Sequence, residues 1–443
     1  MDMNTYGMDR SQAGNRAVDK AKETLRRVFR SYTGGLTLRF WNGETVELGT
    51  AAPRATVVFR APGPFRDLIL YRDPLRLAEA YLRDLVAVEG DLNAVLSQKE
   101  HLASLAPSVL EKFSLLSVAL RMAISSEPGR HGKAGSKGPG RWLAHLSRKH
   151  SRTADREAIA FHYDVSNNFY RLWLDEQMVY SCAYFESTED SLDQAQRNKL
   201  DHICRKLRLR RGERFLDIGC GWGALVCWAA KHYGVRALGV TLSRNQLEYA
   251  QQAIRVQGLE DCVTVELRDY RDVGGNAVFD KIVSVGMFEH VGLKNLPLYF
   301  NTAHRLLAPG GLFLNHGITH DEEGWGKTLA TKFINRYVFP DGELDTVSNV
   351  QRVMERSGFE IWDVEALRRH YALTLRHWVE RLERHRNEAL RHITESVYRI
   401  WLLYMTACAL HFENGDVGVY QILASKKGAR LAAVPLTRRD LYE

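Results

Sequence analysis

A glycine-rich turn at residues 215–223 constrains the fold of this chain more than any other feature. The segment reads F-L-D-I-G-C-G-W-G, in which an apolar strand ends in an acid and three alternate glycines lead into a helix-forming stretch near Ala224. Glycines at these places let backbone N–H groups approach a ligand, and the helix directs the positive end of its dipole toward the same place. The segment therefore predicts an α/β domain that cradles a nucleotide.

The spacing of the glycines separates the candidate ligands NAD, FAD and S-adenosyl-L-methionine. A dinucleotide fingerprint reads G-x-G-x-x-G and has an acid about 20 residues further on. Here Asp217 precedes Gly219, Gly221 and Gly223, and the next strand, at 237–240, is followed by Thr-Leu-Ser. An acid before the first glycine suits a cationic ligand. The run resembles the first motif of the Rossmann-like methyltransferases, whose S-adenosyl-L-methionine carries a sulfonium charge; an ordinary tight turn of an α/β sheet is the alternative.

Length and composition are typical of a protein with two domains. The chain has 443 residues, of which 45% are apolar, enough to build real cores. Its longest apolar run, 400–410, is shorter than the roughly 20 residues that cross a bilayer, and the N-terminus shows no apolar segment for export. The six cysteines form no C-x-x-C pair, so we expect no metal site, and reduced thiols in a cytoplasmic protein.

The positive charge of the chain indicates an acidic partner. The formal net charge is +8, and basic residues concentrate in 130–156, where Asp155 is the single acid. Charge alone does not distinguish nucleic acid from an anionic membrane. Because Trp142 and Leu143 lie among these basic residues, we expect an anionic membrane surface as the partner, peripheral association with its inner face, and no nucleic acid. For the glycine-rich part of the segment, a solvated hinge is an equal alternative.

The same segment divides the chain into an accessory unit at 1–125, a flexible linker at 126–156 and a catalytic domain at 157–443. In the first part, strand-like pieces flank the hairpin signal Asn42-Gly43, and helical sequence follows, which predicts a small α+β unit. The catalytic domain reads as strands alternating with helices. Its strands are expected at 214–218, 236–241, 263–267, 281–285, 311–316 and 417–424.

Six motifs follow one another along the catalytic domain. They are H-Y-D-x-x-N-x-F-Y from His162, Y-S-C-A-Y-F from Tyr180, L-D-I-G-C-G-W-G from Leu216, G-V-T-L-S-x-N-Q from Gly239, M-F-E-H-V-G from Met287 and H-Y-x-x-T-L-x-x-W from His370. Together they resemble the cyclopropane-fatty-acid-phospholipid synthase family, which includes the mycolic acid cyclopropane synthases. The resemblance covers about residues 155–425. It implies a Rossmann-like methyltransferase with a doubly wound, mostly parallel sheet and a helical lid, here joined to the small N-terminal α+β domain.

The chemistry of such an enzyme makes three demands on its residues. An isolated alkene is a weak nucleophile, so it must meet a strongly electrophilic methyl carbon in water-free surroundings, and its attack leaves a carbocation that loses a proton from the new methyl group. The enzyme therefore needs a sulfonium site, an apolar channel with aromatic faces, and a base near the new methyl group.

For the cofactor, the resemblance implies residues from four parts of the catalytic domain. They are Tyr180, Ser181, Asp217, Gly219, Gly221, Gly223, Thr241, Leu242, Gln246, Asp269 and Tyr270. A family tryptophan corresponds to Tyr270 here, and either ring could stack on adenine; a residue at the rim of the site is the alternative for Tyr270.

For the base, the resemblance implies a bound bicarbonate ion. Its cradle would consist of Cys182, Glu289, His316, Ile318 and Tyr371. In this arrangement His316, the phenol and the Ile318 N–H donate to the anion, while Glu289 accepts its O–H and makes it more basic. A surface carboxylate and a core histidine are the alternatives for Glu289 and His316.

Cys408 corresponds to a cysteine once considered for a covalent role in this family. Its neighbours form an apolar helix, where a thiol is hard to ionise, so we expect it to pack. His290, next to Glu289, is expected to support the site without taking part in the chemistry.

The favoured function is an S-adenosyl-L-methionine-dependent lipid cyclopropane synthase that acts on unsaturated phospholipid acyl chains. Loss of the proton elsewhere would give a methylene branch, and capture of water a hydroxylated methyl branch. N-methylation of a small amine and a catalytically silent lipid-binding protein are more distant alternatives. A homodimer joined through the N-terminal unit is expected by analogy alone.

Overall fold

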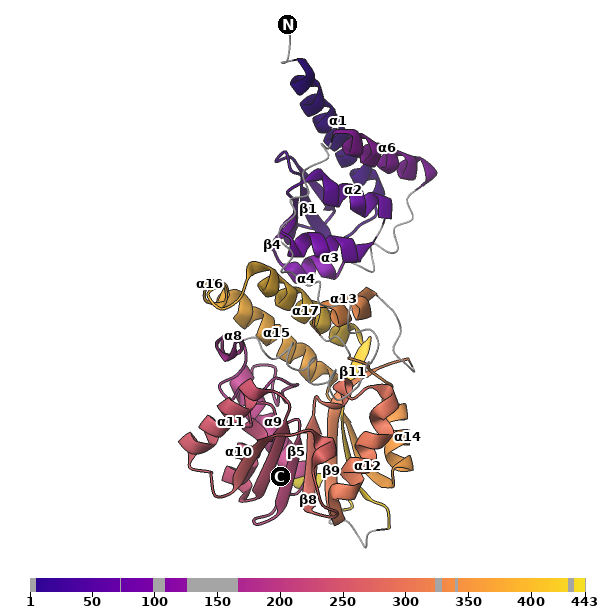
Figure 1. Ribbon diagram of the computed structural model, residues 1–443. Helices are drawn as coiled ribbons and strands as arrows, with labels where there is room; N and C mark the ends of the chain where they lie inside the picture. The colour runs from indigo at the N-terminus through magenta and orange to yellow at the C-terminus, as the bar shows by residue number, and fades with distance from the viewer. Residues whose placement is uncertain are drawn as a thin grey trace. The chain divides into compact units, whose positions relative to one another are not determined.

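The structure, a computed structural model, describes residues 5–71, 73–98, 108–125, 166–322, 329–338, 342–428 and 434–442. The chain divides into two compact units (Figure 1). The first comprises Met1–Trp142 with Thr394–Ala407, and the second comprises Leu143–Ile393 with Cys408–Glu443. The expected linker at 126–156 and the start of the first motif, at 162–165, lie outside the described residues.

The first unit is a four-stranded sheet with helices, in the order β2-β1-β3-β4. Its elements are α1 (Thr5–Val28), β1 (Gly35–Arg39), β2 (Thr45–Gly49), β3 (Ala55–Phe59), α2 (Pro62–Tyr71), α3 (Pro74–Leu82), β4 (Val86–Gly90), α4 (Leu92–Leu96) and α6 (Val109–Ser125). The hairpin predicted at Asn42-Gly43 is confirmed, since β1 and β2 pair antiparallel around it. The rings of Phe40 and Phe59 each meet Phe65 edge to face at 5.2 Å in the core.

The first part of α17 (Glu395–Asn414) groups with this unit, which the sequence pattern had not indicated. Arg399 is the anchor. Its guanidinium donates to the carbonyls of Tyr81 at 2.7 Å and Val86 at 3.2 Å, and it pairs with Asp84 at 2.6 Å. A single side chain therefore satisfies carbonyls at the end of α3 and in β4.

The second unit is a seven-stranded sheet in the order β10-β11-β9-β8-β5-β6-β7. The strands are β5 (Arg214–Ile218), β6 (Arg236–Thr241), β7 (Val263–Leu267), β8 (Phe279–Val285), β9 (Leu307–His320), β10 (Phe359–Ala366) and β11 (Val417–Lys426). All six predicted strands are present. The five from β9 to β7 run parallel, β11 pairs antiparallel with β9, and β10 pairs antiparallel with β11 at the edge. The prediction missed β10, an edge strand whose residues alternate between buried and exposed without an apolar run.

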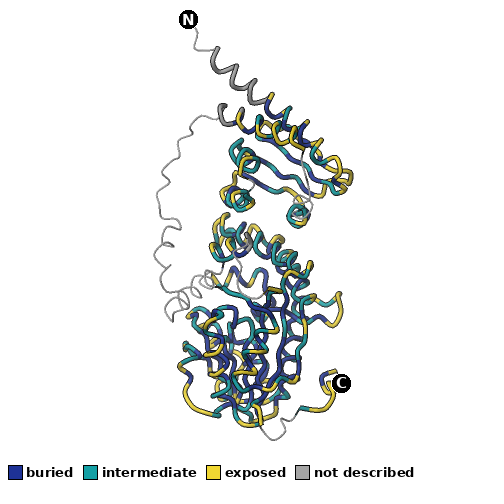
Figure 2. Tube along the Cα trace, turned by 90° about the vertical axis from the view of Figure 1, so that its right-hand side faces the viewer, coloured by how far each residue is buried: buried dark blue, intermediate teal, exposed yellow. Residues whose placement is uncertain are grey.

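Helices cover both faces of this sheet, as the doubly wound fold requires. One face packs on α9 (Leu192–Lys206), α10 (Ala224–Tyr233) and α11 (Arg244–Gln257), and the other on α12 (Leu296–Leu306) and α14 (Val347–Arg356). Neighbouring residues of β5 alternate between these cores: Phe215 lies in the first and Leu216 in the second. Figure 2 shows the resulting buried strands beneath helices whose outer sides are exposed.

The remaining helices of the second unit are shorter or lie near the carboxyl end of the sheet. They are α8 (Asn167–Arg171), α13 (Leu329–Tyr337), α15 (Arg368–Arg384) and α16 (Arg386–Ala389). α15 starts at this edge of the sheet. Leu367, the residue just before it, donates its N–H at 2.8 Å to the carbonyl of Val419, which lies near the start of β11. Within the described parts of the chain, no helix combines the length and the apolar character that crossing a bilayer requires.

Candidate active site

The glycine turn after β5 has the backbone that its sequence predicts. Gly219, Gly221 and Gly223 all lie in the left-handed region, with φ of 83°, 55° and 87°, which other residues rarely adopt. Gly223 is the N-cap of α10. A Cβ on Gly219 would lie 2.9 Å from Cγ of Met287. Both the backbone and the close approach of a neighbouring loop therefore require glycine here.

Asp217 lies in β5 just before this turn. Its side chain is 3% exposed, and Oδ1 has no hydrogen-bond partner. Burial raises the pKa of this carboxyl to about 7, against the lowering effect of Lys199. A buried acceptor without a partner is costly unless a ligand satisfies it. This orphaned oxygen fits a cationic cofactor such as S-adenosyl-L-methionine.

A pocket lies over the turn and brings together most of the predicted cofactor residues. Of that set, the lining includes Tyr180, Ser181, Asp217, Gly219, Gly221, Thr241, Leu242, Gln246 and Tyr270. Two predicted residues do not line it. Gly223 caps α10, and the carboxylate of Asp269 pairs with Arg271 at 2.6 Å. Both residues have structural roles. Gly223 starts α10, and Asp269 orients Arg271, which lines the pocket.

Several lining residues were missed by the sequence reasoning. They include Met178, Lys199, Arg268 and Met287. Lys199 and Arg268 carried no motif signal. Met178 and Met287, by contrast, lie in or next to the six motifs. Trp222, Arg271 and His290, which lie in segments expected to form or support the site, also line the pocket.

Tyr270 is buried, and is not the rim residue that was the alternative. It is 6% exposed, lies in the 3₁₀ turn η2 (Tyr270–Asp272) and meets the ring of Tyr299 edge to face at 5.5 Å. At the end of the neighbouring strand β6, Thr241 Oγ1 donates to Gln246 Oε1 at 2.7 Å. Both groups are held by their neighbours and line the pocket together.

Aromatic rings surround Tyr180. Its ring centroid lies 5.2 Å from that of Trp378 on α15 and 5.4 Å from that of Trp173, and Tyr170 lies 5.0 Å from Trp222. Trp173 and Trp378 are almost fully buried. The faces of such rings stabilise positive charge in an environment without water.

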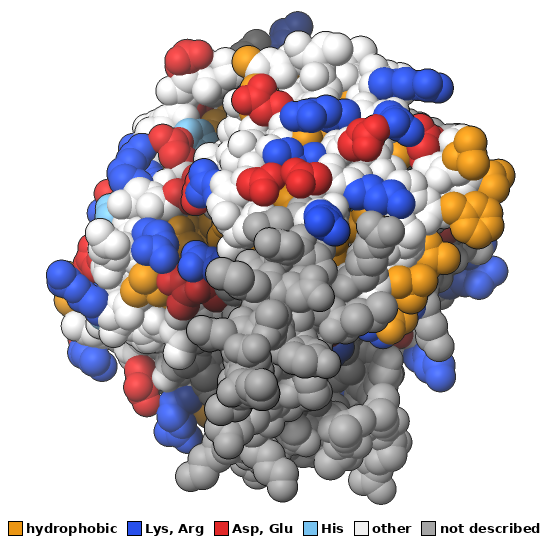
Figure 3. All heavy atoms as spheres, turned by 90° about the horizontal axis from the view of Figure 1, so that it is seen from above, with side chains coloured by type: hydrophobic (Ala, Val, Ile, Leu, Met, Phe, Trp, Pro, Cys, Tyr) orange, Lys and Arg blue, Asp and Glu red, His pale blue; other side chains and the backbone are white. Residues whose placement is uncertain are grey.

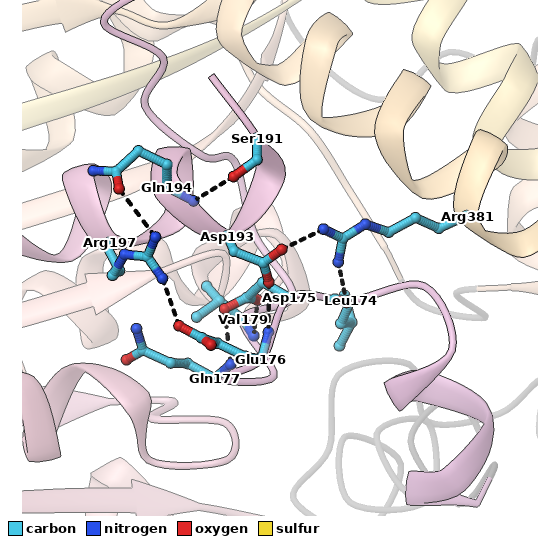
Figure 4. Close-up of polar contacts among 10 residues, drawn as sticks. All are labelled: Leu174, Asp175, Glu176, Gln177, Val179, Ser191, Asp193, Gln194, Arg197 and Arg381. Carbon is cyan, nitrogen blue, oxygen red and sulfur yellow. Dashed lines mark hydrogen bonds and ion pairs between the residues drawn. The ribbon is translucent and has the colours of Figure 1, made fainter. Parts of the chain in front are cut away.

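The segment that carries Met178 to Tyr180 is fixed by a polar network (Figure 4). Asp175 accepts the N–H of Val179 at 2.7 Å and that of Gln177 at 3.0 Å. Arg381 of α15 donates to the carbonyl of Leu174 at 2.8 Å and pairs with Asp193 of α9. The wall of the pocket formed by Met178 to Tyr180 is thus held by α9 and α15, two helices that are far apart in the sequence.

Glu289 is a buried carboxylate at the carboxyl end of β8. It lies in the 3₁₀ turn η3 (Phe288–His290) and is 7% exposed. Its Oε1 accepts the backbone N–H of Ile318 at 2.7 Å, while Oε2 has no hydrogen-bond partner. Burial raises the pKa of Glu289 to about 7. The surface-carboxylate alternative is therefore wrong.

The N–H of Ile318, which the resemblance implies as a donor to the anion, donates to Glu289 in this structure. The hydrogen bond between Ile318 and Glu289 also depends on glycine at position 317. A Cβ there would come 1.9 Å from the ring of Phe288, the residue before Glu289. The structure therefore makes Ile318 a residue that positions the carboxylate.

His316 lies two residues before Ile318 on β9, so both side chains share one face of the strand. It is buried, and its Nδ1 lies 3.2 Å from Nε2 of Gln421. Burial, helped by Lys199 and Lys206, lowers the pKa of His316 to about 3. The ring is neutral at pH 7, and with Nδ1 assigned as acceptor from Gln421, its Nε2–H is a donor.

Cys182 and Tyr371 meet at the start of α15. The thiol of Cys182 lies 3.8 Å from the carbonyl of Leu367, which also accepts the N–H of Tyr371 at 3.1 Å. Leu367 bonds to Val419, which pairs with Ile318 across β11 and β9, so backbone hydrogen bonds connect the start of α15 to the strand that carries His316. Burial raises the pKa of the Cys182 thiol far above its ordinary value, so it is a weak donor and no nucleophile.

Cys408 lies half-buried on α17, one helical turn before Phe412. The ring of Phe412 lies 4.7 Å from that of Tyr371. None of the six cysteines forms a disulfide.

Comparisons with known proteins agree with this geometry. Residues 150–422 match the family model described as mycolic acid cyclopropane synthetase, and residues 22–106 match one described as a domain of unknown function. The fold and the pocket thus define an S-adenosyl-L-methionine-dependent methyltransferase. The chain belongs to the mycolic acid cyclopropane synthetase family, as the motifs predicted.

The proteins similar in sequence include a probable fatty acid methyltransferase and a cyclopropane-fatty-acyl-phospholipid synthase. The chain is 41% identical over 411 residues to a "Probable fatty acid methyltransferase" of Pseudomonas putida, covering 92% of this chain and 96% of that protein. It is 41% identical over 276 residues to the cyclopropane-fatty-acyl-phospholipid synthase of Escherichia coli K12, covering 61% of this chain and 69% of the relative.

Solved structures match the second unit. The cyclopropane synthase MmaA2 from Mycobacterium tuberculosis superposes with a TM-score of 0.58 at 36% identity, over 61% of this chain and 98% of the other. The mycolic acid cyclopropane synthase CmaA1, complexed with SAH and CTAB, gives the same values.

Proposed function

We propose that this protein transfers a methylene group from S-adenosyl-L-methionine to the cis double bond of unsaturated acyl chains in membrane phospholipids, forming a cyclopropane ring. One observation carries the proposal: a buried carboxylate, Glu289, with one fixed and one unpartnered oxygen, lies in the same unit as the cofactor pocket, at the same edge of the sheet. The similarity to the E. coli synthase supports the phospholipid substrate.

The chain's own residues provide the cofactor site. Asp217 offers a buried acceptor, and the backbone of the glycine turn leaves room for a ligand above it. S-adenosyl-L-methionine, when bound, supplies an electrophilic methyl group. The ring of Tyr180 lines the pocket, the buried rings of Trp173 and Trp378 pack against it and exclude water, and such aromatic surroundings stabilise developing positive charge.

Proton removal is assigned to the group around Glu289. Bicarbonate, held there, would supply the base. The donors for it are the Nε2–H of His316 and the hydroxyl of Tyr371, and the acceptor is Oε2 of Glu289. Ile318 positions this group, because its N–H bonds to Glu289, and the thiol of Cys182 lies against the carbonyl of Leu367, which also accepts the N–H of Tyr371.

A branched product is the second candidate. The relative that covers 92% of this chain is named a fatty acid methyltransferase, and its name does not specify a ring. In that case the cation would lose its proton elsewhere or capture water, which gives a methylene- or methyl-branched chain. N-methylation of a small molecule is a third and more distant candidate.

The N-terminal unit is proposed to hold the enzyme at an anionic membrane, with residues 126–156 as a basic linker and 157–443 as the catalytic part. Its exposed large apolar side chains support a lipid contact: on α6 they are Val109, Leu110, Phe113, Leu116 and Leu120. Figure 3 shows apolar side chains gathered at one margin of the face in view, and charged side chains spread over other parts of the coloured surface. Peripheral association with the cytoplasmic side and a homodimer stay predictions, which vesicle sedimentation and analytical ultracentrifugation check.

The product assay decides among these functions. The protein is incubated with S-adenosyl-L-methionine and vesicles of an unsaturated phospholipid, and the acyl chains are analysed by mass spectrometry and NMR. Chains that gain one CH₂ as a cyclopropane ring support the proposal. A gain of CH₂ as a branch selects the second candidate, and methylation confined to added amines would overturn both.

A further inference from the structure

Four consecutive residues, 178–181, line the cofactor pocket, yet they belong to no helix or strand. Met178, Val179 and Ser181 are buried. The backbone N–H and carbonyl groups of a buried segment need hydrogen-bond partners, and here no helix or sheet ladder supplies them. Side chains from outside the segment must therefore hold this wall of the pocket in place.

Asp175 accepts three successive backbone N–H groups at the start of this wall. Its Oδ2 accepts the N–H of Gln177 at 3.0 Å, its main-chain carbonyl that of Met178 at 3.0 Å, and its Oδ1 that of Val179 at 2.7 Å. Figure 4 shows the two bonds of the side chain. Aspartate suits this place, because its short side chain reaches the backbone two residues further on. The carboxylate, itself 3% exposed, thus closes a tight turn.

The turn holds Met178 in a strained conformation. Its φ is +60°, in the left-handed region, which a residue with a Cβ avoids by roughly tenfold in population. Such a conformation persists only where the surroundings enforce it. The N–H groups on either side of Met178, those of Gln177 and Val179, both end on the carboxylate of Asp175. This carboxylate is therefore the group that enforces the turn.

Helix α9 holds the other end of the wall. Gln196 Nε2 donates to the carbonyl of Ser181 at 2.9 Å, and Lys199 Nζ donates to Ser181 Oγ at 3.0 Å. Tyr180 lies between this end and the turn, and its ring lines the pocket. Because Tyr180 follows Met178 by two residues, a change of φ at Met178 would displace its ring.

We propose that Asp175 is a positioning residue for the cofactor: its carboxylate holds the left-handed turn at Met178 and so keeps Tyr180 and Ser181 in place before S-adenosyl-L-methionine binds. Asp175 is not among the residues that line the pocket, so its effect passes through the turn. A wall that is ordered in advance raises affinity, because no ordering cost is then subtracted from the free energy of binding. The inference rests on the cofactor pocket and not on the proposed lipid substrate.

Calorimetry without lipid tests the effect on affinity. The full-length protein is titrated with S-adenosyl-L-methionine at pH 8, where Asp175 is ionised, because burial raises its pKa to about 6. In Asp175→Ala the Kd should rise at least about tenfold, since the turn that binds the cofactor becomes a minor population. Asp190 also accepts two backbone N–H groups, at 2.9 and 3.2 Å, but does not line the pocket. Asp190→Ala is therefore the matched control, in which the Kd should change less than twofold.

A second substitution separates the turn from a general loss of stability. In a chain that carries Met178→Gly, Asp175→Ala should raise the Kd less than about threefold, because glycine adopts a positive φ without support. The comparison is made within that chain, so the loss of the Met178 side chain from the pocket cancels. An equal rise in both chains would show that Asp175 does not act through the turn and would refute the proposal, as would an unchanged Kd in folded Asp175→Ala.

Hydrogen exchange reports on the wall itself. Without cofactor, the amides of residues 177–179 should exchange at least about tenfold faster in Asp175→Ala than in wild type, while those of α9 stay unchanged, and saturating S-adenosyl-L-methionine should restore the protection. If Asp175→Ala does not fold, Asp175→Asn, which keeps one acceptor oxygen, replaces it and should raise the Kd at least about threefold. Equal exchange in variant and wild type would overturn the proposal.

The same titrations separate this inference from the function on which it builds. Absence of binding by the wild type would overturn the cofactor assignment together with the role of Asp175. Because no lipid is present, failure of the proposed lipid reaction would leave the outcome unchanged.

Discussion

The carboxylate of Glu289 accepts the backbone N–H of Ile318 at 2.7 Å, across the ends of two neighbouring strands. One oxygen is thereby fixed, and the other, Oε2, is left buried without a partner. The bond also sets the orientation of the carboxylate relative to His316, two residues earlier on β9. A group held in this way is suited to handle a proton at a defined position.

Glu289→Gln should abolish most turnover and leave the cofactor pocket intact. Removal of a group for proton transfer costs about 10²–10⁴ in rate, so kcat should fall by at least about a hundredfold while the Kd for S-adenosyl-L-methionine changes less than twofold. Steady-state kinetics with vesicles and calorimetry measure the two quantities. Glu360→Gln, an exposed glutamate of β10, is the control; wild-type turnover in Glu289→Gln would remove this residue from the mechanism.

The pH dependence of turnover should follow Glu289. Burial raises its pKa to about 7, so the carboxylate form that accepts a proton exists above pH 7 and is lost as the pH falls through that value. We expect kcat to fall about tenfold per pH unit below pH 7. A profile that stays flat from pH 5.5 to 8 would show that this carboxyl does not govern the rate.

Gly219→Ala should weaken cofactor binding. The residue has φ of +83°, and the new Cβ would lie 2.9 Å from Met287, so the turn must move. We expect the Kd for S-adenosyl-L-methionine to rise at least about tenfold, with a loss of about 1–2 kcal/mol in stability. Gly258→Ala has similar backbone strain at φ +66° with nothing within 4 Å, and should lower stability without changing the Kd. If both variants bind equally well, the turn does not contact the cofactor.

Cys408→Ser should retain activity within about twofold. The thiol lies half-buried on an apolar helix, so a hydroxyl of similar size is tolerated there. The assay is turnover with vesicles after confirmation of the fold by circular dichroism. Loss of more than about a hundredfold in a folded variant would restore a chemical role for this cysteine.

Glu365 should stabilise the second unit against acid. Burial alone would raise its pKa, but the hydrogen bond with His202 at 2.8 Å and the charge of Lys206 bring it to about 2. Because the folded pKa is depressed, the stabilisation is present above about pH 4.5 and is lost as the pH falls toward 2. Glu365→Gln should lower the free energy of unfolding by about 3 kcal/mol at pH 7, and the difference should narrow below pH 4.5. Urea unfolding at several pH values measures this, again with Glu360→Gln as control; a difference independent of pH would contradict it.

Features that depend on neighbours in the sequence were predictable. The glycine turn is one, because positive φ values and helix initiation are properties of a few consecutive residues. The six predicted strands are another, since each carries apolar residues in a run, as in β8, or in alternation, as in the edge strand β7. By contrast, β10 was missed because its pattern is irregular, with Asp363 buried and Trp362 exposed.

The amino-acid sequence by itself determined the α/β class, the cofactor turn and, through six ordered motifs, the family. Only the tertiary structure decided that the Ile318 N–H serves Glu289, that Arg381 secures the pocket wall through Asp193, and that Lys199 lies beside Ser181 and Asp217. The physical reason is that these groups are far apart along the chain. Their meeting depends on strand order and on the packing of α9 and α15, which no local pattern encodes.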